Sequence, residues 1–368
     1  GPVGLGLEIN VDYLAACAVD LAGNIRDNRT LHGDQRGRRS ADILGDLAEL
    51  ARKVSDHPEF TVAGAAVAVP GLVETPRGRI RSAPNLRWQD VEIAQELREL
   101  LPDTPFAPAV GNEADFAALA QAHDARRGAI GAGRGGAAGD TAGAGVTAGV
   151  AGATGSAGAP ALAIDGANGR SARPGASPAG HTNATGTGTG TGTDDPAASH
   201  PDAPLTDFLY VSGEIGVGAG IVLDGELFRG ARGWAGEIGH VTVEPGGTQC
   251  RCGALGCLET VAGLEALRRT GPEAAADALG RAVATAVNLL DLPAVVLGGV
   301  YARPEFAAAL LPGVEQAVAR HVVSARWAPV AVRVSQLGET AAATGAAFAV
   351  IRRIHADPAG WLEVLTRS

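Results

Sequence analysis

Three cysteines and one histidine lie close together in the chain, and their side chains are suited to binding a metal ion. Cys250, Cys252 and Cys257 fall within eight positions, and His240 precedes the first of them by ten. Three thiolates and an imidazole are a common closed ligand set for tetrahedral zinc. The stretch 240–257 is therefore predicted to form a structural zinc knuckle.

Glycines between these cysteines favour the same interpretation. Gly253 and Gly256 allow the loop to curl until all three sulfurs face one ion. A disulfide between Cys250 and Cys252 would be badly strained, and the alternative is a chance cluster of free thiols. Cys17, in an apolar stretch, is expected to be an ordinary core residue. Four cysteines are too few for a disulfide scaffold, so we expect a protein of the reducing cytoplasm.

Composition limits the function classes. The formal net charge is −10, which argues against direct wrapping of nucleic acid, because phosphate contacts need clustered Lys and Arg. No apolar run is long enough for a membrane span, and no basic-then-apolar leader is present, so no membrane association is expected. The first residue is Gly1, which is either the start of a fragment or a cleavage scar.

The elements that must position these residues alternate between strands and helices, which predicts α/β architecture. A helix is predicted to begin with Ser40 as its cap, another to follow Trp88, and a third to begin near Asn112. Strands are predicted at 3–9, 14–20, 61–69, 106–110, 208–211, 220–223, 294–297 and 330–334, with a further strand after a turn at 21–24.

Residues 129–204 are dominated by Gly, Ala and Thr. Large side chains nearly vanish in this segment, so it cannot bury enough surface to offset its ordering entropy. We predict a disordered insertion that the fold does not require.

Several separate motifs lie around the predicted knuckle. They are Ser82 to Trp88 (SAPNLRW), Asn112 to Asp115 (NEAD), Gly213 to Gly220 (GEIGVGAG), Gly236 to His240 (GEIGH) and Cys250 to Glu259 (CRCGALGCLE). In type and order they closely resemble the ROK family of repressors and sugar kinases. Apart from the insertion, the resemblance covers essentially the whole chain.

The resemblance implies the actin-like (ribonuclease H-like) ATPase and sugar kinase fold, in which two α/β domains close over a cleft. The expected division is a smaller domain at 1–111 and a larger one at 112–338 that carries the knuckle. A C-terminal helix at 339–356 is expected to complete the smaller domain. Members of the family are usually homodimers or homotetramers.

By the same resemblance, a small sugar is the expected ligand. The residues implied to contact it are Asn85, Asn112, Glu113, Glu237, His240 and Glu259. His240 would contact the sugar with one ring nitrogen and zinc with the other. The alternatives are that Glu237 and Glu259 are solvated surface carboxylates and that Asn85 belongs to an ordinary turn. Trp88 and Trp234 are interpreted as core or cleft-wall residues.

The ATP-binding motifs of the family's kinases are altered here. The kinases carry Asp-x-Gly-Gly-Thr-Lys on a phosphate-binding hairpin, and the matching stretch 8–13 reads Glu-Ile-Asn-Val-Asp-Tyr. Asp12 and Glu214 place carboxylates where the kinases have hydroxyls that face phosphate, and Glu113 replaces the catalytic aspartate with a longer side chain. These changes predict that ATP does not bind and that no catalytic residue remains.

The sequence therefore favours the sugar-binding effector domain of a ROK transcriptional regulator. Such a regulator would reach operator DNA through a winged helix-turn-helix that is missing from this chain. The alternatives are an ATP-dependent sugar kinase resembling glucokinase and a purely structural scaffold.

Overall fold

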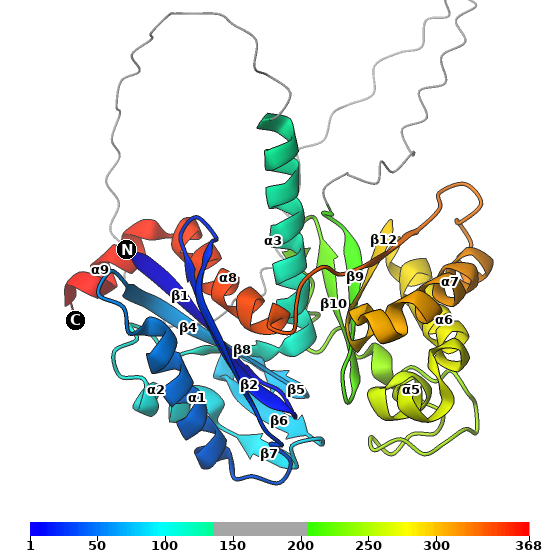
Figure 1. Ribbon diagram of the computed structural model, residues 1–368, viewed down its shortest axis with the longest axis horizontal. Coiled ribbons are helices and arrows are strands. Elements are labelled where there is room, and N and C mark those ends of the chain that lie inside the picture. The colour runs from blue at the N-terminus through cyan, green and yellow to red at the C-terminus, as the bar shows by residue number, and fades with distance from the viewer. Residues whose placement is uncertain (135–204, 368) are drawn as a thin grey trace, which may run out of the picture.

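The computed structural model describes residues 1–134 and 205–367, and their strands form two five-stranded sheets and a small third sheet (Figure 1). The first sheet has the order β3-β2-β1-β4-β8, made of Ile25–His32, Tyr13–Asp20, Pro2–Ile9, Thr61–Val69 and Ala109–Asn112. The second has the order β11-β10-β9-β12-β13, made of Glu226–Leu227, Val217–Leu223, Phe208–Gly213, Ala294–Gly299 and Ala331–Val334. The small sheet joins β5 (Leu72–Glu74), β6 (Arg79–Ala83) and β7 (Trp88–Val91).

Both large sheets begin with antiparallel strands and continue with parallel ones. In the first, β1, β2 and β3 pair antiparallel, whereas β4 is parallel to both β1 and β8. In the second, β9, β10 and β11 pair antiparallel, and β12 is parallel to both β9 and β13. Parallel neighbours need crossover connections, usually helices. The predicted α/β architecture with its opening run of strands is confirmed.

Helices cover both large sheets because strand residues alternate between the two faces. On β1, Val3, Leu5, Leu7 and Ile9 pack in one core with α1 (Ser40–Ser55) and α2 (Ile93–Leu100). The opposite face of this sheet packs against α8 (Ala341–Ala356), followed by α9 (Pro358–Arg367).

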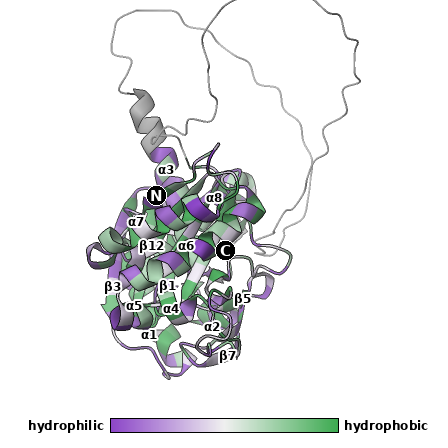
Figure 2. Ribbon diagram, turned by 90° about the vertical axis from the view of Figure 1, so that its right-hand side faces the viewer, coloured by the Kyte–Doolittle hydropathy of each residue, from purple (hydrophilic) through white to green (hydrophobic). Residues whose placement is uncertain are grey.

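The second sheet is covered in the same way. One face packs against α3 (Glu113–Arg134), and the other shares a core with α5 (Leu264–Thr270), α6 (Pro272–Leu290) and α7 (Pro304–His321). Helices α6 and α7 face the viewer in Figure 2 and carry both hydrophobic and hydrophilic residues, as helices between a core and solvent do.

Helices α3 and α8 pack against each other between the two sheets (Figure 1). Their crossing depends on Gly345, where a Cβ atom would lie only 1.7 Å from the carbonyl oxygen of Phe116. A core of both sheets and both helices includes Cys17, which is fully buried as predicted. The N-terminal ends of α3 and α8 are thereby held beside the same region, where the site described below lies.

Some boundaries predicted from the sequence are wrong. Ser40 does not cap α1, because it is the first helical residue and the N-cap, Arg39, makes no side-chain cap. The strand expected at 106–110 is β8 at Ala109–Asn112, whereas the helix predicted after Trp88 is confirmed as α2, which follows strand β7.

The predicted insertion overlaps helix α3. Helix α3 continues to Arg134, so the first six residues of the predicted 129–204 segment are helical. The rest of that prediction, 135–204, lies outside the described residues. Within the described part of the chain, no helix is long and apolar enough to cross a membrane.

Candidate functional site

The four residues of the predicted knuckle meet at one point. The ligand atoms of His240, Cys250, Cys252 and Cys257 all lie within 4.8 Å of one another. Cys250 Sγ is 3.8 Å from His240 Nδ1, and Cys252 Sγ is 3.6 Å from Cys257 Sγ. Zinc–sulfur bonds of about 2.3 Å place tetrahedral ligands roughly 3.8 Å apart, so the spacing and the donor set fit a metal ion.

Backbone hydrogen bonds fold the knuckle. Cys250 N donates to Ala254 O at 2.8 Å, and Gly256 N donates to Thr248 O at 2.9 Å. Gly256 has φ +70°, and a Cβ atom there would lie 1.7 Å from the carbonyl oxygen of Glu244. A residue with a side chain would therefore push the loop open.

His240 presents its two ring nitrogens to different partners. Nδ1 faces the cysteines, whereas Nε2 lies 3.8 Å from Glu237 Oε2. Both residues lie at the short helix η2 (Ile238–His240), with Glu237 directly before it. The pKa of Glu237 is raised by burial, although nearby His240 acts against that shift. A histidine that is held at one ring nitrogen and faces a carboxyl group with the other has a defined ring orientation and tautomer.

Glu259 and Asn85 meet above Gly216. Glu259 begins the short helix α4 (Glu259–Ala262), and its Oε2 accepts a hydrogen bond from Val217 N at 3.3 Å. A Cβ atom on Gly216 would lie 2.7 Å from this Oε2 and 3.5 Å from Asn85 Nδ2. The structure therefore brings together two predicted sugar residues from distant parts of the chain.

Arg251 links the knuckle to the loop that carries Asn85. Its Nη1 donates to Asn85 Oδ1 at 2.5 Å, and its Nη2 lies 3.7 Å from Glu265 Oε1. Trp234 makes a second link, since its Nε1 donates to Val73 O at 3.0 Å. Both contacts join the part of the chain after β9 to the small sheet and its loops. The role of Arg251 could not be found from the sequence, where it is merely the residue between two cysteines.

Asn112 and Glu113 lie where β8 ends and α3 begins. Both ends of the Asn112 amide contact backbone, because Nδ2 donates to Gly71 O at 3.1 Å and Oδ1 accepts from Ala114 N at 2.8 Å. Burial raises the pKa of Glu113 well above its usual range, with further contributions from Glu214, Glu8 and Glu237. Glu113 is therefore close enough to feel the negative charge of Glu237 on one hand and of a separate group of carboxyls, which includes Glu8 and Glu214, on the other.

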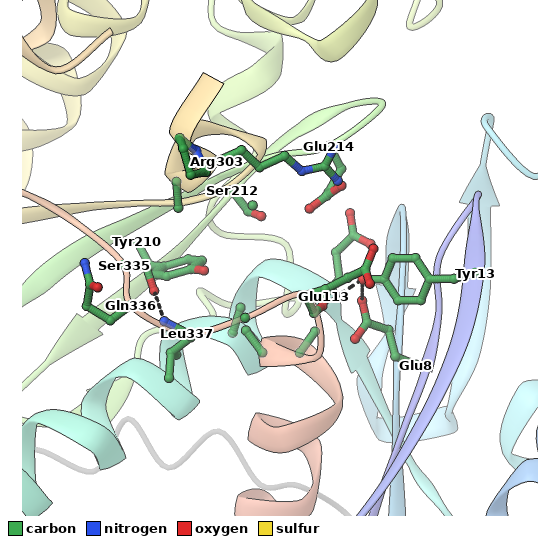
Figure 3. A pocket seen from close by; sticks show the side chains of 18 residues that line it. Glu8, Tyr13, Glu113, Tyr210, Ser212, Glu214, Arg303, Ser335, Gln336 and Leu337 are labelled. Atoms are coloured by element: carbon green, nitrogen blue, oxygen red, sulfur yellow. Dashed lines mark hydrogen bonds between the residues drawn. The ribbon is translucent and has the colours of Figure 1, made fainter. Parts of the chain in front are cut away.

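That group surrounds a cavity of about 540 Å³ (Figure 3). Of the residues predicted to bind sugar, only Glu113 lines it. Its other titratable residues are Glu8, Tyr13, Tyr210, Glu214, Arg303 and Glu339. The sequence motifs pointed to the stretches around Glu8 and Glu214, but they gave no sign of Arg303 or Glu339.

Glu8 and Tyr13 form a buried pair at one side of this cavity (Figure 3). The Tyr13 hydroxyl lies 2.7 Å from Glu8 Oε1 and 2.9 Å from the carbonyl oxygen of Glu339. Glu8 Oε2 accepts a hydrogen bond from Ala343 N, in the first turn of α8, at 3.0 Å. Burial raises the pKa of Glu8 to about 7, against the effect of these hydrogen bonds.

Two further carboxyls have raised pKa values. Burial raises the pKa of Glu214 to about 8, with Glu8 adding to the shift and Arg303 opposing it. Burial also raises the pKa of Asp115, on α3, to about 7, although Arg229 lies 3.9 Å away. At neutral pH both Glu214 and Asp115 are thus partly protonated.

Asp12 lies near the cavity without lining it, and its Oδ1 is bound by Arg36 Nη1 at 2.9 Å. The predicted repulsion of phosphate by Asp12 stays a prediction. Negative charge near this hairpin comes from Glu8, which lines the cavity, and also from Asp12, which contributes to the raised pKa of Glu214.

The sequence profile of the ROK family matches residues 4–169, 200–273 and 272–353. This chain belongs to the ROK family. The family resemblance found from the sequence motifs is confirmed.

Relatives of this ROK chain include regulators and kinases. It is 23% identical over 265 residues to the xylose repressor of Caldicellulosiruptor bescii, which covers 72% of this chain and 47% of that protein. The chain thus spans about half the length of the curated repressors it matches. It is 54% identical to a glucokinase of Halalkalibacterium halodurans over 59 residues, 16% of this chain and 18% of that one.

Solved ROK structures establish the fold. A ROK transcriptional regulator described as a homologue of the Escherichia coli MLC protein aligns with a TM-score of 0.65 at 19% identity, covering 100% of this chain and 81% of the other. A ROK hexokinase from Thermus thermophilus aligns with a TM-score of 0.62 at 22% identity, covering 96% and 99%. The predicted sugar kinase-like, actin-like fold is confirmed by these alignments.

Proposed function

We propose that this chain is the sugar-binding effector part of a ROK transcriptional regulator and does not phosphorylate its sugar. Operator DNA would be bound through a separate winged helix-turn-helix. The match to only about half the length of the repressors leaves room for such a module. The sequence identity to xylose repressors over 72% of this chain supports a regulator.

The observation that carries this proposal is the hairpin between β1 and β2. In the family's kinases, glycine, threonine and lysine at this place hold phosphates. Here the Tyr13 side chain faces the cavity, and its hydroxyl lies beside the Glu8 carboxyl. The backbone N–H of Ala343 at the start of α8, a natural partner for phosphate, is already bonded to Glu8. A triphosphate would have to displace these contacts and approach carboxyls (Figure 3).

We propose that the ion in the knuckle is zinc and that it is structural. Three thiolates and an imidazole satisfy four-coordinate zinc and leave no open position for catalysis. When bound, the ion would hold His240 by Nδ1, which directs Nε2 towards Glu237. It would also fix the start of α4, because Glu259 follows Cys257 by two positions.

We assign the sugar to the space between Asn85, Asn112, Glu113, Glu237, His240 and Glu259. Carboxylates, amides and an imidazole hold ring hydroxyls through paired hydrogen bonds. Asn85 lies in the loop between β6 and β7, whereas Glu259 belongs to the part of the chain after β9. A sugar that contacts both residues would favour one relative orientation of the proposed domains 1–111 and 112–338. It does so only if it binds that orientation more tightly than the alternative.

Titration calorimetry without ATP tests this function directly. The wild-type chain is expected to bind at least one member of a panel of hexoses, pentoses and amino sugars. Glu237→Ala and Glu259→Gln should each weaken that binding about a hundredfold, because a charged hydrogen-bond acceptor is lost in a partly buried site. Glu315→Gln, at an exposed position on α7, is the matched control and should bind like the wild type. A silent titration across the whole panel would contradict the proposal.

Arg251→Met is expected to weaken sugar binding about fivefold while zinc remains bound. The substitution removes the guanidinium that holds Asn85 Oδ1 but keeps much of the aliphatic stem. The effect is modest because this side chain is 56% exposed. Arg268→Met on the solvent face of α5 is the control. Sugar affinity equal to that of the control, measured by calorimetry, would show that Arg251 does not position Asn85.

The second candidate function is an ATP-dependent sugar kinase, favoured by the 54% identity to a glucokinase over 59 residues. A coupled assay for ADP release with magnesium and the same sugars distinguishes the two. Turnover in the usual enzyme range of about 1–1,000 per second would establish the kinase. Sugar binding without turnover and without ATP binding would establish the sensor.

A further inference from the structure

The acidic cavity contains polar groups with no partner among the described residues. The side-chain oxygens of Glu113 and Glu214 make no hydrogen bond in the described part of the chain, and both half-buried residues line the cavity (Figure 3). Ser212 also lines the cavity with only 9% of its surface exposed, and its hydroxyl has no hydrogen-bond partner in the same described ranges. No fully buried side-chain nitrogen or oxygen among the described residues lacks a partner, so these three side chains have oxygens that reach the open space of the cavity. Ser212 is the one of the three that is otherwise buried, and its unpaired hydroxyl is available to a ligand there.

Four carboxyl groups reach the cavity from different elements. Glu8 comes from β1, Glu113 from the start of α3, Glu214 from the turn after β9, and Glu339 from the segment before α8. Arg303, the N-cap of α7, is the only cationic side chain among the lining residues. The helix starts of α3, α7 and α8 add partial positive charge. Glu8 is already bonded to the start of α8, which leaves Glu113 and Glu214 without a comparable contact.

Other parts of the lining carry no charge. Apolar and hydroxyl groups are contributed by Ala117, Tyr210, Ser212, Pro304, Ser335 and Leu337. A cavity of about 540 Å³ falls in the range of small-molecule sites and is far larger than one metal ion requires. A cation that fills it therefore needs an organic body as well as a charge.

We propose that this cavity binds a small organic amine, with its ammonium group between Glu113 and Glu214 and its uncharged body against the uncharged lining residues. The ammonium donates hydrogen bonds to both carboxylates, and a polar group on the body reaches the Ser212 hydroxyl. This function is additional to sugar binding and does not depend on it. Because Glu113 also borders the predicted sugar site, an amine here would lie next to a bound sugar.

Binding of the amine is linked to proton release. Burial raises the pKa of Glu214 to about 8, and burial together with the nearby Glu214 raises the pKa of Glu113 well above its usual range. An ammonium favours their ionised forms and lowers these pKa values. Affinity is therefore expected to rise from pH 6 to pH 9, where the carboxyls ionise and a primary amine of pKa near 10 is still charged.

Calorimetry with tyramine, agmatine and spermidine on the full chain tests the proposal. At least one amine is expected to bind with a dissociation constant below about 1 mM and to release protons, measured in two buffers of different ionisation enthalpy. For tyramine, 4-ethylphenol is the matched probe, since it keeps the ring and hydroxyl without the ammonium, and it should bind at least about tenfold more weakly. Glu214→Gln should weaken the amine about tenfold or more and leave the sugar affinity unchanged, whereas Glu315→Gln should change neither.

Several outcomes would overturn the assignment. These are no binding by any of the three amines, equal binding of tyramine and 4-ethylphenol, and binding unaffected by Glu214→Gln. Tighter binding of magnesium than of every amine would reassign the carboxylates to a metal ion. Binding of ATP in the same cavity would remove both this proposal and the sensor function, whereas failure of the amines alone would leave sugar sensing intact.

Discussion

Replacing Cys252 by serine is expected to abolish stoichiometric zinc binding and to weaken sugar binding at least about tenfold. Cys252 is exposed, so the substitution itself costs little packing. It removes one of four ligands, and the protein purified under reducing conditions should then lose its zinc. His240 then loses the metal contact that orients its ring. Loss of the partners that orient a metal-site histidine typically lowers affinity or activity about 10–100-fold. Zinc content by mass spectrometry and sugar affinity by calorimetry measure the two losses.

Cys17→Ala is the matched control because Cys17 is also a thiol but lies in strand β2, fully buried and away from the knuckle. It is expected to keep both zinc and sugar. Chelation of the wild-type protein should reproduce the Cys252→Ser phenotype, and added zinc should reverse it. A wild-type protein purified without zinc, or a chelated one that binds sugar normally, would refute the shared role of His240.

The sequence predicted the elements and the metal-ligand cluster well because both depend on local patterns. Strand β4 at Thr61–Val69 has the predicted bounds, since a run of apolar residues there ends at Pro70-Gly71. The knuckle could be predicted because its three cysteines lie within eight positions and two glycines permit the turn. The predicted cap of α1 was wrong because serine's preference for N-cap positions is only a tendency, and here the helix begins at Ser40 with Arg39 before it.

The acidic cavity could be predicted only in part. Glu8 and Glu214 stand out through their motifs, but the positions of Arg303 and Glu339 depend on how α7 and α8 pack against distant strands. The ion pair between Asp12 and Arg36 could not be predicted for the same reason, since Arg36 lies 24 positions away in the chain. Sequence patterns give residue types and local spacing, whereas long-range ion pairs follow from the tertiary fold.

The cavity also predicts how stability depends on pH. Glu8 is 2% exposed, and its pKa is raised from an ordinary value of 4.5 to about 7. The unfolded chain therefore loses this proton at lower pH than the folded one. Glu8's contribution is fully present below pH 4.5 and is lost as the pH rises through 7. Each pKa unit corresponds to about 1.4 kcal/mol, so Glu8 alone is expected to remove about 3 kcal/mol of unfolding free energy by pH 8.

Glu8→Gln isolates this contribution. The Tyr13 hydroxyl has one hydrogen, so it bonds both Glu8 and the Glu339 carbonyl only when the Glu8 carboxyl is protonated and donates. Glutamine has an amide that donates at every pH and an oxygen that can accept from Ala343 N. We expect the variant to match the wild type at pH 5 and to exceed it by about 2 kcal/mol at pH 8, measured by urea unfolding.

Glu315→Gln should match the wild type at both pH values, because that carboxyl is exposed. A Glu8→Gln variant that is less stable than the wild type at pH 8 would mean that the ionised carboxylate is the stabilising form. The carboxylate would then bond Ala343 N at the start of α8, and the acidic cavity would be organised around a charged Glu8 instead of a neutral one.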